Sequence, residues 1–82
     1  MDKGEILRKL SETLSDILDR EVNLEENTVS SDVEGWDSLV QMTFMLLIER
    51  DFGVELTIEE IGKFENVGKL VDRIAAEKKT AY

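Results

Sequence analysis

The feature that most limits the fold of this chain is the spacing of its apolar residues. In residues 3–19 apolar positions recur three and four residues apart with charged residues between them, which is the period of an amphipathic α-helix. The same spacing returns in residues 67–78. The chain contains no proline, so no proline ring interrupts a helix, and turns depend on Gly, Asn, Asp and Ser. This pattern predicts an all-α fold.

The first half of the chain is predicted to hold two helices joined by a long loop. The helix over residues 3–19 is followed by residues 20–36, where the helical period fails and turn-forming residues are frequent. A connection of this length is usually functional or held in place by its own side chains. Asp37 is a good N-cap for a second helix over residues 38–52, and Gly53 closes it.

The second half is predicted to add a short helix and a closing helix. The sequence of residues 57–60 matches a capping box and starts a third helix, which Gly62 limits to little more than a turn or two. Asn66 is expected to cap the fourth helix over residues 67–78. With 82 residues and 41% hydrophobic content, the chain suits one domain over residues 1–82.

Composition argues against several classes of active site. The chain has no cysteine and no histidine, which removes disulfides, imidazole catalysis and soft metal sites. A catalytic Ser38 would need a base, so we expect no enzyme. A calcium site could use Asp32, Glu34 and Asp37, but their spacing lacks the EF-hand pattern, so we expect no metal.

Charge is concentrated in the middle of the chain. The formal net charge is −9, and residues 21–60 hold eleven acidic residues against a single basic one, Arg50. Such a field repels nucleic acids and anionic lipid, and it speeds encounter with proteins that carry basic patches. No stretch is apolar enough to span a membrane, and the first residues lack the apolar segment of a secretory signal. We therefore expect a cytoplasmic monomer with basic protein partners.

The helix over residues 38–52 carries more apolar surface than one packing face requires. One stripe is assigned to the core and consists of Phe44, Met45, Ile48 and Phe52. A second stripe is rotated away from the first, is predicted to dock a partner, and consists of Leu39, Met42 and Leu46. The alternative is a central helix that is buried nearly all round.

Ser38 is predicted to lie in the first turn of this helix, where unpaired backbone N–H groups and the positive helix end would stabilise a phosphate on its oxygen. By itself, Asp37-Ser38-Leu39 is also an ordinary capping sequence. The segments on either side of this tripeptide help to distinguish these two interpretations. The segment Gly35-Trp36-Asp37-Ser38-Leu39 follows an acidic loop, and Glu49-Arg50-Asp51-Phe52-Gly53-Val54-Glu55-Leu56 ends the apolar helix.

Together these features resemble the phosphopantetheine-binding domain of acyl and peptidyl carrier proteins, over nearly the whole chain. The resemblance implies a four-helix bundle of acyl-carrier type with a long first loop and a short third helix. It implies that Ser38 is the attachment point for phosphopantetheine, transferred from coenzyme A by a phosphopantetheinyl transferase. It also implies that Asp37 assists the transferase, besides its capping role.

The resemblance further implies how such a carrier works. The thiol of the arm carries acyl groups as thioesters to synthetases and synthases of fatty acid, lipid or polyketide biosynthesis, which meet Leu39, Met42 and Leu46. The family commonly stows the acyl chain in an apolar cleft beside this helix, and the alternative for those residues is ordinary core. The candidate lining residues are Phe44, Met45, Leu47, Ile48, Ile61, Phe64 and Val67.

One departure bears on the subclass of carrier. Housekeeping fatty acid carriers place acidic residues just after the serine and one turn further on, whereas this chain has Val40, Gln41 and Thr43. We therefore favour a carrier dedicated to a specialised lipid, polyketide or aminoacyl pathway. The alternatives are an aminoacyl or peptidyl carrier and an unmodified acidic adaptor that binds its partner through the same helix.

Overall fold

The computed structural model describes residues 2–61 and 64–79, with the backbone alone for residues 58, 61, 78 and 79. Its helices are α1 (Lys3–Leu18), the 3₁₀ helix η1 (Ser30–Asp32), α2 (Ser38–Phe52), α3 (Ile58–Ile61) and α4 (Val67–Lys79). Within the described residues there is no strand, so the all-helical class is confirmed.

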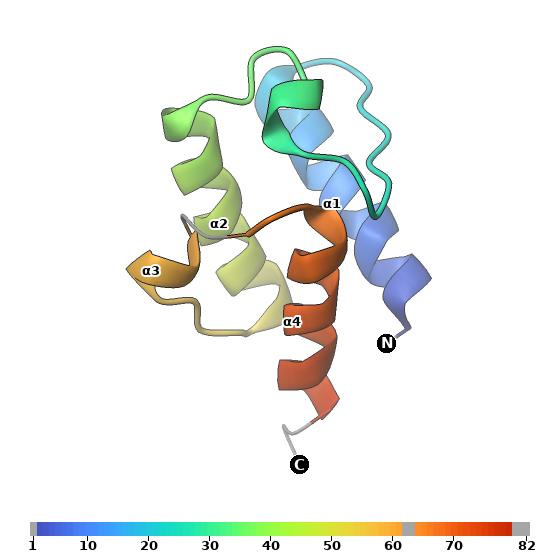
Figure 1. Ribbon diagram of the computed structural model, residues 1–82, viewed down its shortest axis with the longest axis vertical. Helices are drawn as coiled ribbons and strands as arrows, with labels where there is room; N and C mark the ends of the chain where they lie inside the picture. Colours follow the sequence, from blue (N-terminus) through green and yellow to red (C-terminus); the bar gives the residue numbers. More distant parts are fainter. Residues whose placement is uncertain (1, 62–63, 80–82) are drawn as a thin grey trace.

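Three long helices build the core. Helix α1 packs against both α2 and α4, while α3 lies against α2 (Figure 1). Because α3 is a single turn of four residues, the predicted four-helix bundle is not confirmed beyond its all-helical class. The fully or nearly fully buried apolar side chains of the three long helices are Ile6, Leu10, Leu14, Phe44, Met45, Ile48, Phe52, Val67, Leu70, Val71 and Ile74.

The helix ends follow from local capping. Asp2 accepts a hydrogen bond from the N–H of Glu5 at 2.8 Å and starts α1. Helix α1 ends one residue earlier than predicted, because Asp19 adopts a left-handed conformation with φ of 55°. Helix α2 has the predicted bounds, since it ends at Phe52 and is closed by the C-cap Gly53, whose φ is 68°.

The first part of the long loop is attached to α1 through two serine hydroxyls. The backbone N–H of Val22 donates to Ser15 Oγ at 2.8 Å, and that of Leu24 donates to Ser11 Oγ at 3.0 Å. The side chains of Val22 and Leu24 are buried in the core. The segment therefore runs along α1, where the N–H groups of its two buried residues are satisfied.

The second part of the loop is attached to the start of α4 (Figure 1). The N–H of Val67 donates to the Thr28 carbonyl at 2.9 Å, and the N–H of Gly68 donates to the Glu26 carbonyl at 2.7 Å. A Cβ atom on residue 68 would lie 2.8 Å from the Glu26 oxygen. Glycine at this position is what allows the loop backbone to approach so closely.

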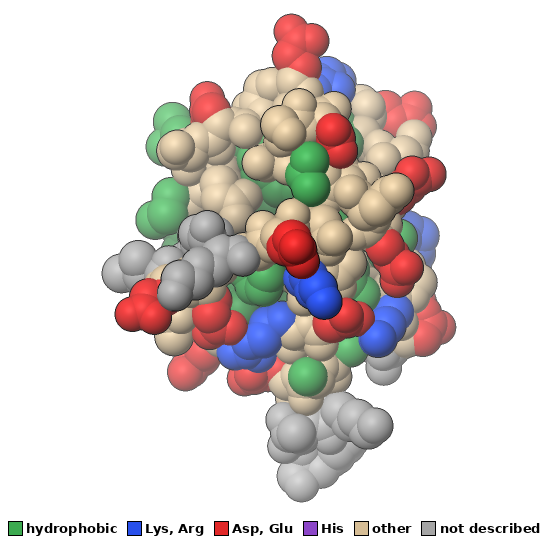
Figure 2. Space-filling model, viewed as in Figure 1, with side chains coloured by type: hydrophobic (Ala, Val, Ile, Leu, Met, Phe, Trp, Pro, Cys, Tyr) green, Lys and Arg blue, Asp and Glu red, His purple; other side chains and the backbone are tan. Residues whose placement is uncertain are grey.

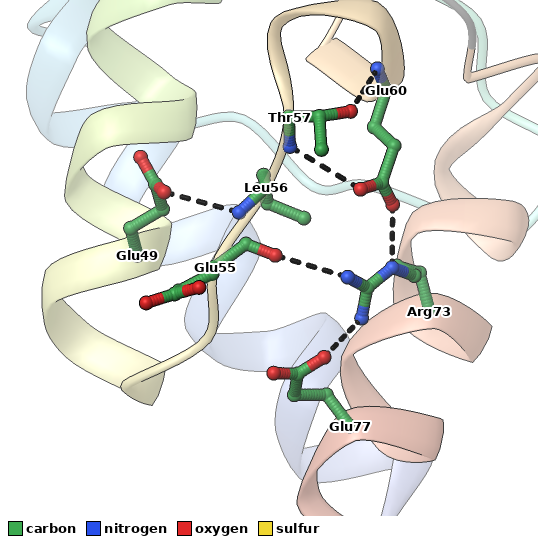
Figure 3. Close-up of polar contacts among 7 residues, drawn as sticks. All are labelled: Glu49, Glu55, Leu56, Thr57, Glu60, Arg73 and Glu77. Atoms are coloured by element: carbon green, nitrogen blue, oxygen red, sulfur yellow. Dashed lines mark hydrogen bonds and ion pairs between the residues drawn. The ribbon is translucent and has the colours of Figure 1, made fainter.

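The connection after α2 is held by a network centred on Arg73 of α4 (Figure 3). Its guanidinium binds Glu60 at 2.5 Å, Glu77 at 2.6 Å and the carbonyl of Glu55 at 2.9 Å. At the start of α3, Thr57 and Glu60 exchange hydrogen bonds at 3.2 and 3.1 Å, which confirms the predicted capping box. One arginine thus fixes α3 to α4.

This network predicts a dependence of stability on pH. The hydrogen bond from Arg73, followed by that from Thr57, lowers the pKa of Glu60 below its ordinary value of about 4.5. A lowered pKa stabilises the fold above the ordinary value, and this contribution is lost as the pH falls through the folded-state pKa. In urea titrations at pH 7 and pH 3, acidification should therefore lower the free energy of unfolding less in Glu60→Gln than in the wild type.

The control is Glu59→Gln, which removes one carboxylate from the same helix but from outside the Arg73 network. Its acid sensitivity should match that of the wild type. If acidification lowers the free energy of unfolding equally in Glu60→Gln and Glu59→Gln, the Arg73–Glu60 ion pair contributes nothing to folding.

Candidate functional site

The candidate site is the first turn of α2. Asp37 caps the helix, since its Oδ1 accepts from the N–H of Val40 at 2.9 Å while its carbonyl accepts from the N–H of Gln41 at 2.9 Å. Ser38 is the first residue of α2 and is exposed. The cap residue predicted from the sequence is confirmed, and it fixes the start of the helix at the serine.

A tight turn brings the loop to this point. Gly35 has a φ of 90°, and the N–H of Asp37 donates to its carbonyl at 3.0 Å. The Trp36 N–H donates to the Val33 carbonyl at 3.2 Å. The guanidinium of Arg20, just beyond α1, binds the carbonyl of Glu34. The backbone on the N-terminal side of Ser38 is thus held at several consecutive residues.

The electrostatics of this turn suit an anionic substituent. In an α-helix the first N–H groups have no intrahelical acceptor, and the N-terminus carries a partial positive charge. Asp37 satisfies the N–H of Val40, which leaves those of Ser38 and Leu39 directed out of the helix end. A phosphate esterified to Ser38 Oγ would be stabilised there without help from a basic side chain.

Two hollows meet beside Ser38. A surface hollow is lined by Ser30, Trp36, Asp37, Ser38 and Gln41. Adjoining it, a cavity of about 170 Å³, which is partly open to solvent and is called the interior cavity from this point, shares Ser30, Trp36 and Gln41 with that hollow. The cavity continues inward between the loop, α2 and the start of α4, where it is lined by Thr28, Val29, Met45, Phe64, Glu65, Asn66, Val67 and Leu70.

Trp36 and Gln41 are linked across the junction of these hollows. The indole Nε1–H donates to Gln41 Oε1 at 2.6 Å. The indole ring also meets Phe44 edge to face, with ring centroids 5.5 Å apart. Trp36 is half-buried, so one side of the ring is in contact with the core while the other faces the hollow.

The apolar strip predicted on α2 is exposed. Leu39, Met42 and Leu46 have 76%, 46% and 60% of their surfaces accessible, whereas the other stripe of α2 is buried. Figure 2 shows hydrophobic side chains on the side of the molecule occupied by α2, with acidic side chains over much of the visible face. The helix is therefore not buried all round.

The described residues also bear on two other kinds of site. No described helix has both the length and the apolar character needed to cross a bilayer. Among residues 2–61 and 64–79, no three or more acidic side chains are gathered so that they could hold a metal ion.

A family model described as a phosphopantetheine attachment site matches residues 8–74. The chain belongs to this family. The comparisons with curated proteins and with solved structures gave no significant match. The resemblance found in the sequence is thereby confirmed at the level of the carrier family, and the cofactor of such a carrier is a covalently attached phosphopantetheine group.

Membership defines the general role of the chain. Domains of this family are non-catalytic carriers, and they interact with phosphopantetheinyl transferases and with partner enzymes. The residues at the start of α2 fit the group, because Ser38 offers an exposed hydroxyl on a helix end that favours phosphate.

The residues predicted to line an acyl cleft in this carrier fall into three groups. Met45, Phe64 and Val67 line the interior cavity. Phe44 and Ile48 are core residues outside the cavity lining, and Leu47 is half-buried and also outside it. The side chain of Ile61 lies outside the described residues.

Sequence reasoning missed part of the cavity lining. The residues that it did not assign are Thr28, Val29, Ser30, Trp36, Gln41, Glu65, Asn66 and Leu70. One signal was available in the sequence, since Gln41 interrupts a strongly apolar helix four residues after the cap, and Trp36 directly precedes that cap. Their pairing depends on the turn at Gly35.

The geometry of the first turn predicts different effects for its two polar residues. Asp37→Ala should lower the free energy of unfolding by about 1 kcal/mol, because it removes the cap of α2. Ser38→Ala should change it by less than about 0.5 kcal/mol, since the hydroxyl is exposed. Urea titration of the unmodified protein checks both values, and a larger loss for Ser38→Ala would indicate a structural role for the hydroxyl.

Proposed function

We propose that this protein is an acyl carrier protein whose phosphopantetheine arm is attached to Ser38. The chain would act as one carrier domain over residues 1–82, with α3 as the short third helix of an acyl-carrier bundle. It would deliver acyl intermediates to enzymes of a specialised lipid or polyketide pathway. The observation that carries the proposal is the exposed Ser38 hydroxyl at the capped start of α2, within the matched segment.

The residues around Ser38 would have distinct tasks. The first-turn N–H groups would stabilise the phosphodiester, and Asp37 would hold that turn in place and help the transferase to recognise it. When bound, phosphopantetheine supplies a thiol that carries acyl groups as thioesters. Ser38 itself needs no activating base in the carrier, because the transferase performs the chemistry.

The exposed strip and the acidic surface suggest how partners would bind. Leu39, Met42 and Leu46 offer apolar contact next to Ser38, and the acidic segment would attract enzymes with basic patches. The uncharged Val40, Gln41 and Thr43 favour partners other than those of a housekeeping fatty acid synthase. An aminoacyl or peptidyl pathway remains the alternative, and the cytoplasmic location and the monomeric state stay predictions.

Intact mass spectrometry tests the attachment. After incubation with coenzyme A and a promiscuous transferase, the wild type should gain the mass of one phosphopantetheine group, and peptide mapping should place it on Ser38. Ser38→Ala should gain none, and Ser31→Ala, which alters another exposed serine, should gain one group. A wild-type protein that gains no mass would instead favour the unmodified adaptor.

The docking role of the strip is tested by Leu46→Arg. Because 60% of the Leu46 surface is accessible, the substitution should change the free energy of unfolding by less than about 1 kcal/mol. It should lower kcat/KM for modification by the same transferase about tenfold, equivalent to about 1.4 kcal/mol of lost contact.

The matched control is Ala76→Arg, which adds the same charge at an exposed position of α4. Its kcat/KM should stay within about twofold of the wild type, since the change lies outside the strip. An equal loss in both variants would attribute the effect to charge alone, and unfolding of Leu46→Arg would place the strip in the core.

A further inference from the structure

The Trp36–Gln41 hydrogen bond lies at the residues shared by the hollow at Ser38 and the interior cavity. The acyl group on the arm, called the cargo from this point, would arrive at the hollow and be held in the cavity. The surface hollow contains Ser38, the interior cavity does not, and the residues common to both are Ser30, Trp36 and Gln41. Of these three, Trp36 and Gln41 are joined by a hydrogen bond of 2.6 Å. A group tethered at Ser38 must pass these side chains to enter the cavity by this route.

The cavity suits a small cargo. Its volume of about 170 Å³ is close to the roughly 150 Å³ of a protein cavity that accommodates one benzene molecule. It therefore has room for about six carbon atoms. Met45, Phe64, Val67 and Leu70 supply apolar lining, and Thr28, Ser30, Glu65 and Asn66 supply polar lining. The cavity thus suits a short acyl tail whose thioester end stays near Ser30, which the cavity shares with the hollow at Ser38.

The link between Trp36 and Gln41 is suited to opening. The Trp36 indole donates one hydrogen bond to Gln41 and meets Phe44 edge to face, and the residue is only half-buried. Rotation of the indole would break that bond, while the backbone of the turn would stay fixed by the contacts of Glu34 and Asp37. Opening would break one hydrogen bond, the edge contact with Phe44 and part of the packing of the half-buried ring against the core.

We propose that Trp36 and Gln41 form a latch over the interior cavity, which admits a short acyl chain of up to about six carbons and excludes the tail of a longer one. The proposal rests on the proposed function, since it requires an arm at Ser38. It assigns Trp36 and Gln41 as residues that determine cargo size.

The test loads the protein with acetyl, hexanoyl or dodecanoyl cargo from the corresponding acyl-coenzyme A and a promiscuous transferase. Mass spectrometry first verifies loading, so a failure at that step contradicts the proposed function and not the latch alone. The chain has a single tryptophan, which gives one indole N–H signal in nuclear magnetic resonance spectra. Cargo labelled at its terminal methyl group reports where the tail lies.

For hexanoyl cargo, the terminal methyl group should show contacts with the side chains of Met45 and Leu70, and the indole N–H signal should shift relative to the unloaded arm. For dodecanoyl cargo, the terminal methyl group should show no such contacts, because the tail exceeds the cavity. Equal contacts for both cargoes, or none for hexanoyl, would overturn the proposal.

Variants test the latch itself. Gln41→Met keeps the length of the side chain but removes the acceptor of the indole N–H, whereas Gln41→Glu keeps an acceptor oxygen at that position. Hydrogen exchange of the indole N–H should be about fivefold faster in Gln41→Met than in the wild type, equivalent to about 1 kcal/mol. The Gln41→Glu variant should exchange within about twofold of the wild type.

Trp36→Phe removes the donor and narrows the ring while keeping an aromatic group against Phe44. In this variant the terminal methyl group of hexanoyl cargo should show stronger contacts with Met45 than in the wild type, because the side chain that closes the cavity is smaller. The terminal methyl group of dodecanoyl cargo should still show none, because its tail exceeds the cavity. Thermal unfolding verifies that each variant is folded. If Trp36→Phe shows the same cargo contacts as the wild type and the indole N–H of Gln41→Met exchanges at the wild-type rate, Trp36 and Gln41 do not form a latch.

Discussion

The position of Ser38 depends on how the loop between α1 and α2 is held. Two α1 serines accept hydrogen bonds from its first part, and the first turn of α4 donates to carbonyls of its second part. Since the loop is attached to two helices, the point at which α2 begins is fixed relative to the core. The Asp37 cap then sets the first helical residue, which leaves the serine exposed on a supported helix end.

Much of this arrangement follows from local chemistry, which is why the sequence predicts it. Capping depends on residues a few positions apart, so Asp37 and Gly53 define α2 without knowledge of the fold. The exposed strip was also predictable, because a small bundle cannot bury every apolar residue of that helix. The same argument identifies the buried stripe that begins at Phe44.

The features that sequence reasoning missed depend on contacts between distant segments. The cavity forms where the loop at Thr28, the middle of α2 at Met45 and α4 at Leu70 meet, and no local pattern encodes that meeting. Phe44 and Ile48, for which the sequence left cleft and core open, are core residues. The capping box that starts α3 is local and was predicted, whereas its attachment to α4 depends on Arg73, which lies far along the chain.

The attachment of the loop to α4 has a consequence for sequence variation. Both bonds join backbone groups, from Val67 and Gly68 to the carbonyls of Thr28 and Glu26, and the side chain of Glu26 is exposed. The loop can therefore exchange its surface residues, and with them its charge, while the serine keeps its place. Partner preference and scaffold geometry can evolve separately, provided that residue 68 stays small.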